Sequence, residues 1–113
     1  MIILQIVIID DDCNQAKTLS DILTFHNLPN IFKNNPLDVL DIKHIDILIT
    51  DIMMPKLNGI ELAKKCLKIN PDLLTIFISA YSSLTLDQDA VLFIKPLISG
   101  QMEKLIKILK SKV

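Results

Sequence analysis

The sequence predicts an α/β fold, in which helices cover both faces of a doubly wound, parallel, five-stranded sheet. The strand candidates read as nearly continuous apolar runs, which is typical of parallel strands buried on both faces. Segments with apolar residues at helical spacing follow most of these runs, so strand and helix alternate along the chain. Hydrophobic residues make up 50% of the sequence and only two residues are glycine, which favours strands and helices over long loops.

The first half of the chain predicts two strands and two helices. The β-branched run IILQIVII indicates a strand over Ile2–Ile9, and apolar residues at helical spacing indicate a helix over Asn14–His26, ended by a Leu-Pro pair. A short strand fits Asn30–Lys33. The following Asn-Asn-Pro is a turn signal, and after it a weakly marked short helix fits residues 37–42.

The second half predicts three more strands and two helices. IDILIT indicates a buried strand over Ile45–Thr50, and a loop with Met-Pro and Asn-Gly leads to a clear amphipathic helix over Ile60–Ile69. The runs LLTIFISA and VLFI indicate strands over Leu73–Ala80 and Val91–Ile94. A last amphipathic helix, over Ser99–Lys110, closes the predicted alternation.

Length and charge limit the classes of function. A domain takes roughly 100–200 residues, so we expect residues 1–113 to form a single domain. The sequence has 13 acidic residues, and its 12 basic residues are all lysine, which gives a formal net charge of -1. No global positive field therefore attracts nucleic acid or an acidic membrane surface, and we expect no direct nucleic-acid binding.

Several features favour a cytoplasmic protein without a membrane segment. The longest apolar stretch, Met1–Ile9, is far shorter than the ~20 residues that a bilayer crossing needs, and no basic region precedes it as in a signal peptide. Cys13 and Cys66 are too far apart for a CxxC motif, so we expect ordinary buried or half-buried thiols in a reducing compartment. His26 and His44 have no metal-ligand spacing with them and are interpreted as structural or surface residues.

Polar residues follow the predicted strands, at the edge where parallel sheets bind ligands. Asp10 and Asp11 follow the first strand, Asp51 follows the third, Ser79 lies at the end of the next, and Lys95 follows the last. Three carboxylates within about 5 Å repel one another unless a cation neutralises them. Mg2+ binds carboxylate and phosphate oxygens, and a lysine and a hydroxyl can contact the remaining phosphoryl oxygens. This set of residues therefore predicts phosphoryl transfer onto a carboxylate at a Mg2+ site.

A simpler interpretation of the first acids is helix capping. Asp10, Asp11 and Asp12 precede a predicted helix, and an aspartate there accepts backbone hydrogen bonds and interacts favourably with the helix dipole. We expect this role for Asp12, which has no evident part in metal binding.

Four blocks of the sequence resemble the response-regulator receiver domains of two-component signalling, which have a flavodoxin-like or CheY-like fold. The blocks are the acid pair that ends IVIIDD, the segment IDILITDIMMPKLNG, Ser79-Ala80 and Lys95-Pro96. They stand in the order of the family and span nearly the whole chain. The segment around Asp51 is the most specific of them.

The resemblance implies roles for the acids. Asp51 would be the phosphoacceptor, which attacks a phosphohistidine to form an acyl phosphate. Asp11 would bind Mg2+ directly and Asp10 mainly through water, with Asp51 and the backbone carbonyl of Met53 completing the protein ligands. Mg2+ is thus the implied cofactor.

The resemblance also implies which residues contact the phosphoryl group and which proteins donate it and respond to it. Ser79 and Lys95 would contact the phosphoryl group, and the peptide bond before Pro96 would often be cis. A sensor histidine kinase or a phosphotransfer protein would phosphorylate Asp51 and so switch the binding of a downstream protein. The chain would catalyse only its own phosphorylation and dephosphorylation, and it would not be an enzyme otherwise.

The segment before the last strand departs from the family. Only fifteen residues separate Ser79 from Lys95, fewer than receivers usually have, which leaves little room for the helix expected there. We expect Tyr81–Asp89 to form a loop or a single turn, so the fourth helix would be reduced or replaced by a loop. Met53 and Tyr81 flank the path of attack in the family, and we expect them to hinder water and prolong the phosphorylated state.

Two other functions compete with the phosphoacceptor switch. The shortened segment favours a receiver-like interaction module that binds its partner without phosphorylation. The spacing Asp10-x-Asp12 resembles that of haloacid-dehalogenase-type phosphatases, although such enzymes generally need a larger chain with a cap. A dinucleotide site is excluded because acids stand where GxGxxG would be needed.

Overall fold

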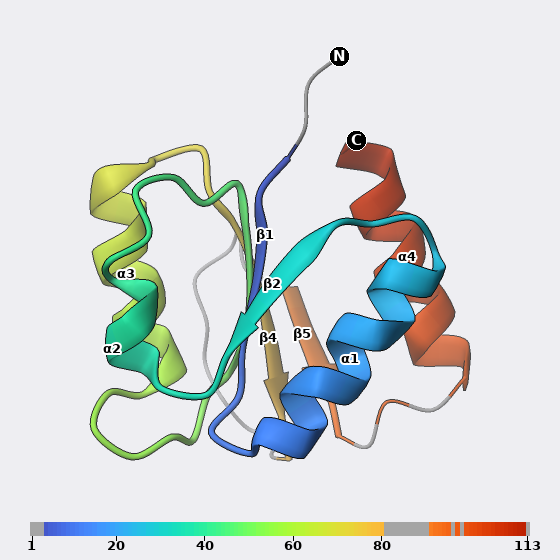
Figure 1. Ribbon diagram of the computed structural model, residues 1–113, viewed down its shortest axis with the longest axis horizontal. Helices are drawn as coiled ribbons and strands as arrows, with labels where there is room; N and C mark the ends of the chain where they lie inside the picture. The colour runs from blue at the N-terminus through green and yellow to red at the C-terminus, as the bar shows by residue number, and fades with distance from the viewer. Residues whose placement is uncertain (1–3, 81–90, 96, 98, 113) are drawn as a thin grey trace.

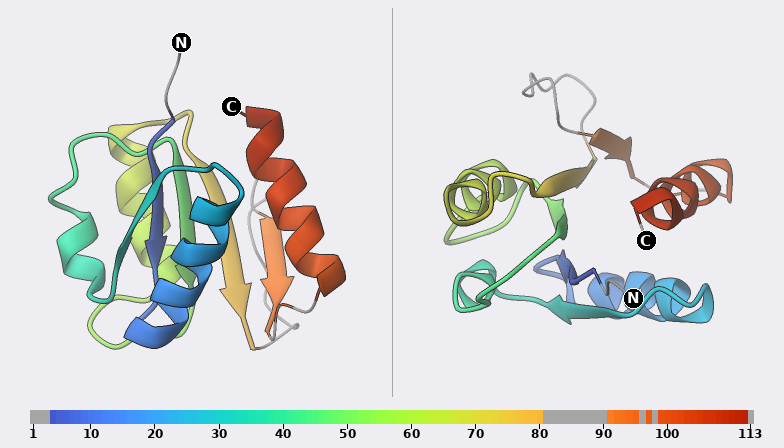
Figure 2. Two further views of the ribbon diagram at one scale, coloured as in Figure 1. Left: turned by 45° about the vertical axis from the view of Figure 1, so that its right-hand side comes forward. Right: turned by 90° about the horizontal axis from the view of Figure 1, so that it is seen from above.

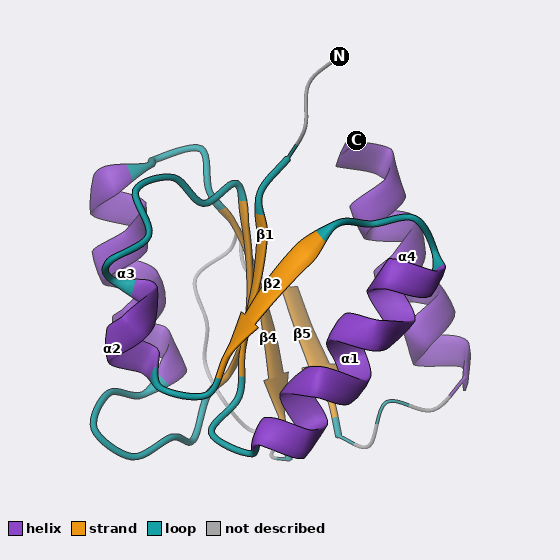
Figure 3. Cartoon of the chain, in the orientation of Figure 1, coloured by secondary structure: helices purple, strands orange, loops and turns teal. Residues whose placement is uncertain are grey.

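Strands and helices alternate along the chain in the predicted order (Figures 1 and 3). The computed structural model describes residues 4–80, 91–95, 97 and 99–112. The elements are β1 (Ile6–Ile9), α1 (Cys13–Phe25), β2 (Asn30–Lys33), α2 (Pro36–Val39), β3 (Ile47–Asp51), α3 (Gly59–Ile69), β4 (Leu74–Ser79), β5 (Val91–Ile94) and α4 (Ser99–Lys112). The loop or turn predicted over Tyr81–Asp89, and Pro96, lie outside the described residues.

The strands form one parallel sheet in the order β2-β1-β3-β4-β5. From β1 the chain first adds β2 on one side and then crosses to add β3 on the other. The direction of winding therefore reverses between β1 and β3, which is where ligands bind in open α/β sheets. The predicted five-stranded parallel sheet is confirmed.

Helices cover both faces of the sheet, α1 and α4 on one and α2 and α3 on the other (Figure 2). Successive side chains of a strand point to opposite faces. Accordingly Ile6 and Ile8 pack in the core under α1 and α4, whereas Val7 and Ile9 pack in the core under α2 and α3. Burial on both faces explains why the strands read as continuous apolar runs.

Residues 2 and 3 of the first predicted strand lie outside the described residues. Among the described residues, two predicted strands begin later than expected, because side chains form hydrogen bonds with the backbone just before their starts. Gln5 precedes β1, and its backbone N–H donates to the Asp46 carboxylate at 2.8 Å. The carbonyl of Ile45 accepts from the Asn70 side-chain amide at 2.8 Å, and β3 starts two residues later, at Ile47. β2 and β5 have the predicted bounds, and the remaining bounds differ from the predicted ones by at most three residues.

The cysteines lie in different environments. Cys66 is a buried residue of α3, and its burial raises the pKa of the thiol. Cys13, which was expected to be at least half-buried, is exposed because it is the first residue of α1 and lies beside the solvent-facing acids. Both thiols are free. Over the described ranges, none of the helices combines the length and the apolar character needed to cross a membrane.

Candidate functional site

The register of β1 and β3 places the first two acids side by side. Ile9 is paired with Thr50, so the residues that follow, Asp10 and Asp51, emerge at the same level of neighbouring strands. Both reach the edge where the winding of the sheet reverses. Asp11 continues from Asp10 into the loop before α1.

The register of β4 and β5 brings Lys95 to the same edge. Ser79 is paired with Ile94, and the backbone N–H of Lys95 donates to the Ser79 carbonyl at 2.7 Å. Ser79 is fully buried as the last residue of β4. The predicted hydroxyl and ammonium thus come from adjacent strands, next to the strand that ends in Asp51.

Asp10, Asp11 and Asp51 form an acid cluster. One carboxylate oxygen from each lies within 4.8 Å of the others. Asp10 is buried, Asp11 is exposed and Asp51 is half-buried, so the cluster opens to solvent on one side. An all-oxygen donor set that is open to water fits Mg2+, which keeps several of its water ligands.

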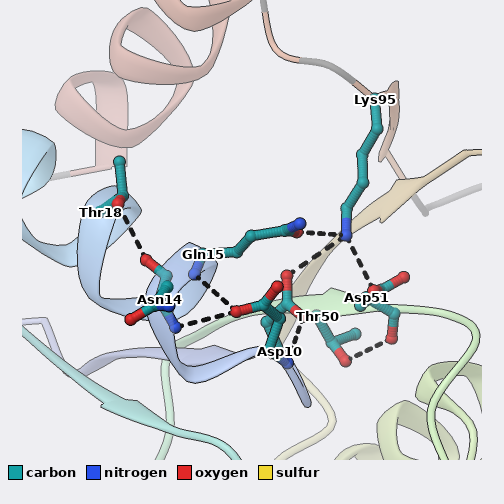
Figure 4. A network of polar contacts seen from close by, with 8 residues as sticks. Asp10, Asn14, Gln15, Thr18, Thr50, Asp51 and Lys95 are labelled. Carbon is teal, nitrogen blue, oxygen red and sulfur yellow. Dashed lines mark hydrogen bonds and ion pairs between the residues drawn. The ribbon is translucent and has the colours of Figure 1, made fainter.

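The ammonium of Lys95 neutralises part of this acid cluster (Figure 4). It donates to Asp51 Oδ2 at 2.9 Å and reaches Asp10 Oδ2 at 3.3 Å. Its third contact is with Gln15 Oε1 at 2.8 Å, in the first turn of α1. Lys95 therefore links one acceptor that directly follows β1, one in α1 and one at the end of β3.

Burial and charge shift two pKa values in the site. Burial raises the pKa of Asp10, and the negative charge of Asp51 adds to this effect, although the Asp12 N–H and the Lys95 ammonium oppose it. For Lys95 burial lowers the pKa, but the ion pairs with Asp51 and Asp10 outweigh burial, so the net shift is upward. The ion pairs thus favour the charged form of Lys95, whereas burial disfavours the ionised form of Asp10.

Replacing Asp10 with asparagine should stabilise the fold in a way that depends on pH. The pKa of Asp10 is higher in the folded protein than in the unfolded chain, so the folded state loses stability as pH rises through that folded pKa. We expect D10N to have a higher urea midpoint than wild type at pH 7, without Mg2+, and the difference to disappear near pH 4. Equal midpoints at pH 7 would contradict a costly buried carboxylate at this position.

The start of α1 confirms the role predicted for Asp12. Its side chain caps the helix by accepting from the backbone N–H groups of Asn14 at 3.0 Å and Gln15 at 3.3 Å. The Asp12 N–H in turn donates to Asp10 Oδ1 at 2.9 Å. This bond fixes Asp10 by one oxygen, and its other oxygen faces Lys95.

Met53 lies in the loop directly after β3, two residues beyond Asp51, and is 62% exposed. That it hinders water beside the acceptor stays a prediction. Tyr81, the other residue expected to flank the path of attack, lies outside the described residues.

Three supporting residues were not predicted. Gln15 contacts Lys95, and the buried hydroxyl of Thr50 donates to the Asp51 carbonyl at 2.8 Å. Gly59 lies so close to the same carbonyl that a Cβ built on it would be 2.1 Å from the oxygen. The Asn-Gly pair was interpreted only as a loop signal, whereas Gly59 begins α3 and Asn58 caps it. Its close backbone approach could have been suspected from the rarity of glycine in this sequence.

Comparison with known proteins identifies the family. Residues 6–108 match the family of the response regulator receiver domain. The chain belongs to this family. The receiver protein CpdR of Brucella abortus is 43% identical over 44 residues, which is 39% of this chain and 37% of CpdR. The transcriptional regulatory protein ZraR of Klebsiella oxytoca is 30% identical over 105 residues, which is 90% of this chain and only 22% of ZraR.

Solved structures show the same fold as this receiver domain. A two-component transcriptional regulator AraC from Clostridium phytofermentans has a TM-score of 0.83 at 28% identity, over 97% of this chain and 94% of the other. The response regulator TrrA of Thermotoga maritima, solved in complex with Mg2+ and beryllofluoride, has a TM-score of 0.76 at 23% identity, over 94% and 98%. This receiver therefore has the fold of two-component response regulators.

Proposed function

We propose that this receiver domain accepts a phosphoryl group on Asp51 in a Mg2+-dependent reaction. The donor is the phosphohistidine of a sensor histidine kinase or a phosphotransfer protein, and the acyl phosphate switches the binding of a downstream protein. One observation carries the proposal: Asp51 lies within an acid cluster and at the same time forms a 2.9 Å ion pair with Lys95.

The metal ligands in this proposal are the carboxylates of Asp10, Asp11 and Asp51 and the carbonyl of Met53. All are oxygen donors, and the three carboxylate oxygens already lie within 4.8 Å of one another. When bound, Mg2+ supplies positive charge that offsets the charge of the phosphoryl oxygens and the acids. TrrA, which shares this fold, is bound to Mg2+ and beryllofluoride.

In the proposed step a carboxylate oxygen of Asp51 attacks phosphorus. An O–P bond forms while the P–N bond to the donor histidine breaks, and the electron pair of that bond returns to the imidazole nitrogen. Asp51 is suited to this attack because it is only half-buried at the open edge of the sheet. The product is an acyl phosphate on Asp51.

Lys95 and Ser79 stabilise the transferred group. The Lys95 ammonium, 2.9 Å from Asp51 Oδ2, needs only a small shift to pair with a phosphoryl oxygen attached there. Ser79 ends the adjacent strand, and its hydroxyl donates a hydrogen bond to another phosphoryl oxygen. Thr50 holds the Asp51 backbone in place while the side chain reacts.

The proposed chemistry is confined to the chain itself. Phosphorylation and loss of phosphate take place on Asp51, and the proposal includes no separate substrate that is turned over. The protein acts in the cytoplasm, where its two free thiols, one of them exposed, stay reduced. Regulators such as ZraR are several times longer than the part that this chain matches, so the output belongs to a partner or to a further segment.

Intact-mass spectrometry after incubation with a small acyl-phosphate donor tests the proposal. We expect wild-type protein to gain one phosphoryl mass with Mg2+ and none when Mg2+ is chelated. D51N should gain none, whereas D72N, a matched change of an exposed aspartate outside the cluster, should behave as wild type. Folded wild-type protein that gains no mass would overturn the proposal and favour an interaction module that works without phosphorylation.

A further inference from the structure

The contact between Lys95 and Gln15 has no part in the proposed chemistry, yet it is the shortest of the three contacts of this ammonium. Gln15 Oε1 lies 2.8 Å from Lys95 Nζ, compared with 2.9 Å for Asp51 and 3.3 Å for Asp10. An ammonium has three N–H donors, and these three acceptors occupy them. The side chain of Gln15 enters from α1, on the side of Lys95 away from β3 (Figure 4).

A neutral acceptor at this position changes how many N–H groups of Lys95 are left to bind the carboxylates. A lysine ammonium and a divalent cation compete for the same carboxylate oxygens, because both are drawn to negative charge. The amide oxygen of Gln15 satisfies one N–H without using a carboxylate. The contact of Lys95 with Asp10 Oδ2, at 3.3 Å, is the longest of the three.

We infer that Gln15 is a positioning residue that draws Lys95 toward α1 and so leaves the acid cluster free to bind Mg2+. Without its amide oxygen, the third N–H of Lys95 would turn to Asp10 and shorten that contact. The ammonium would then hold Asp10 and Asp51 together and oppose the cation. This inference rests on the proposed function, and it names a residue that favours the Mg2+ binding which that function requires.

The surroundings of Gln15 allow this contact to form and break. Gln15, Lys95 and Asp10 are among the residues that line a pocket of about 640 Å³ between α1 and α4, whose lining also includes the apolar Ile22 and Met102. Gln15 is itself exposed. Its side chain can therefore release Lys95 toward a phosphoryl group without repacking the core.

Mg2+ binding by wild-type protein and Q15L, measured by isothermal titration calorimetry without any phosphodonor, tests this inference. Leucine keeps the approximate size and the helix propensity of glutamine but has no acceptor. We expect the Mg2+ dissociation constant to rise about two- to thirteen-fold, which corresponds to the loss of one hydrogen bond of about 0.5–1.5 kcal/mol. Q15M should reproduce the loss, and Q15E, which keeps an acceptor oxygen, should not show it.

N14L is the matched control because it removes an amide in the same helical turn, and no contact with Lys95 is found for Asn14 among the described residues. Its Mg2+ affinity should equal that of wild type.

A second readout separates positioning from a structural role: excess Mg2+ should restore the phosphorylation rate of Q15L to that of wild type. Equal Mg2+ affinities of wild type, Q15L and Q15M would overturn this inference but leave the proposed function standing. Wild-type protein that binds no Mg2+ would overturn the proposed function and the inference with it.

Discussion

Replacing Lys95 with methionine should slow the phosphorylation of Asp51 by about 100-fold at saturating Mg2+. Methionine keeps the length of the side chain and removes the charge that pairs with Asp51 at 2.9 Å. The transferred phosphoryl group would then lose the protein cation that stabilises its oxygens. The rate is measured as the gain of one phosphoryl mass over time with a small acyl-phosphate donor.

The same variant should bind Mg2+ more tightly than wild type, because the ammonium that competes for Asp10 and Asp51 is gone. K104M, in which an exposed lysine of α4 is changed in the same way, is the control and should alter neither quantity. A K95M protein that reacts as fast as wild type would show that Lys95 is only a structural counterion. Slower reaction together with tighter metal binding would separate its two roles.

Replacing Gly59 with alanine should lower the free energy of unfolding by about 2–3 kcal/mol. The added Cβ would lie 2.1 Å from the carbonyl oxygen of Asp51 and 3.1 Å from the Cα of Ile52. These are backbone atoms, so no change of rotamer relieves the overlap, and either α3 or the end of β3 must move. The variant should also be phosphorylated more slowly, because that movement displaces the acceptor.

G100A is the matched control, measured by urea denaturation beside G59A. Gly100 lies in the first turn of α4, and a Cβ built on it meets nothing within 4 Å. There alanine should leave stability unchanged or raise it by up to about 1 kcal/mol, because glycine is a poor helix former. Similar losses in both variants would contradict close packing at Gly59 as the cause.

The fold could be predicted closely because its strands are continuous apolar runs. Ile6–Ile9 and residues 47–49 are apolar at every position, which is typical of parallel strands with helices on both faces. The starts of the strands were less certain, since they depend on contacts that are distant in sequence. The bond between Gln5 and Asp46, which are 41 residues apart, is one such contact.

The acids of the site could be predicted because parallel strands bring their carboxyl ends to one edge. Asp10 and Lys95 directly follow strands, and Asp51 is the last residue of one. The supporting residues around these acids could not be predicted in the same way. Gln15 lies on a helix face where a polar residue is expected in any case, and only the geometry of α1 shows that it reaches Lys95. Thr50 looks like one more β-branched residue of a strand, although its hydroxyl holds the acceptor's carbonyl.

Mapping the acyl phosphate tests most directly whether Asp51, rather than Asp10 or Asp11, is the phosphoacceptor. Borohydride reduces an acyl phosphate to the alcohol and releases phosphate, so a phosphorylated aspartate becomes homoserine. Trypsin separates the candidates, because Asp51 lies in the peptide His44–Lys56 and both other acids lie in Met1–Lys17. Tandem mass spectrometry should find homoserine at position 51 only, and only after incubation with both donor and Mg2+. Homoserine at position 10 or 11, or at none of the three, would contradict Asp51 as the acceptor.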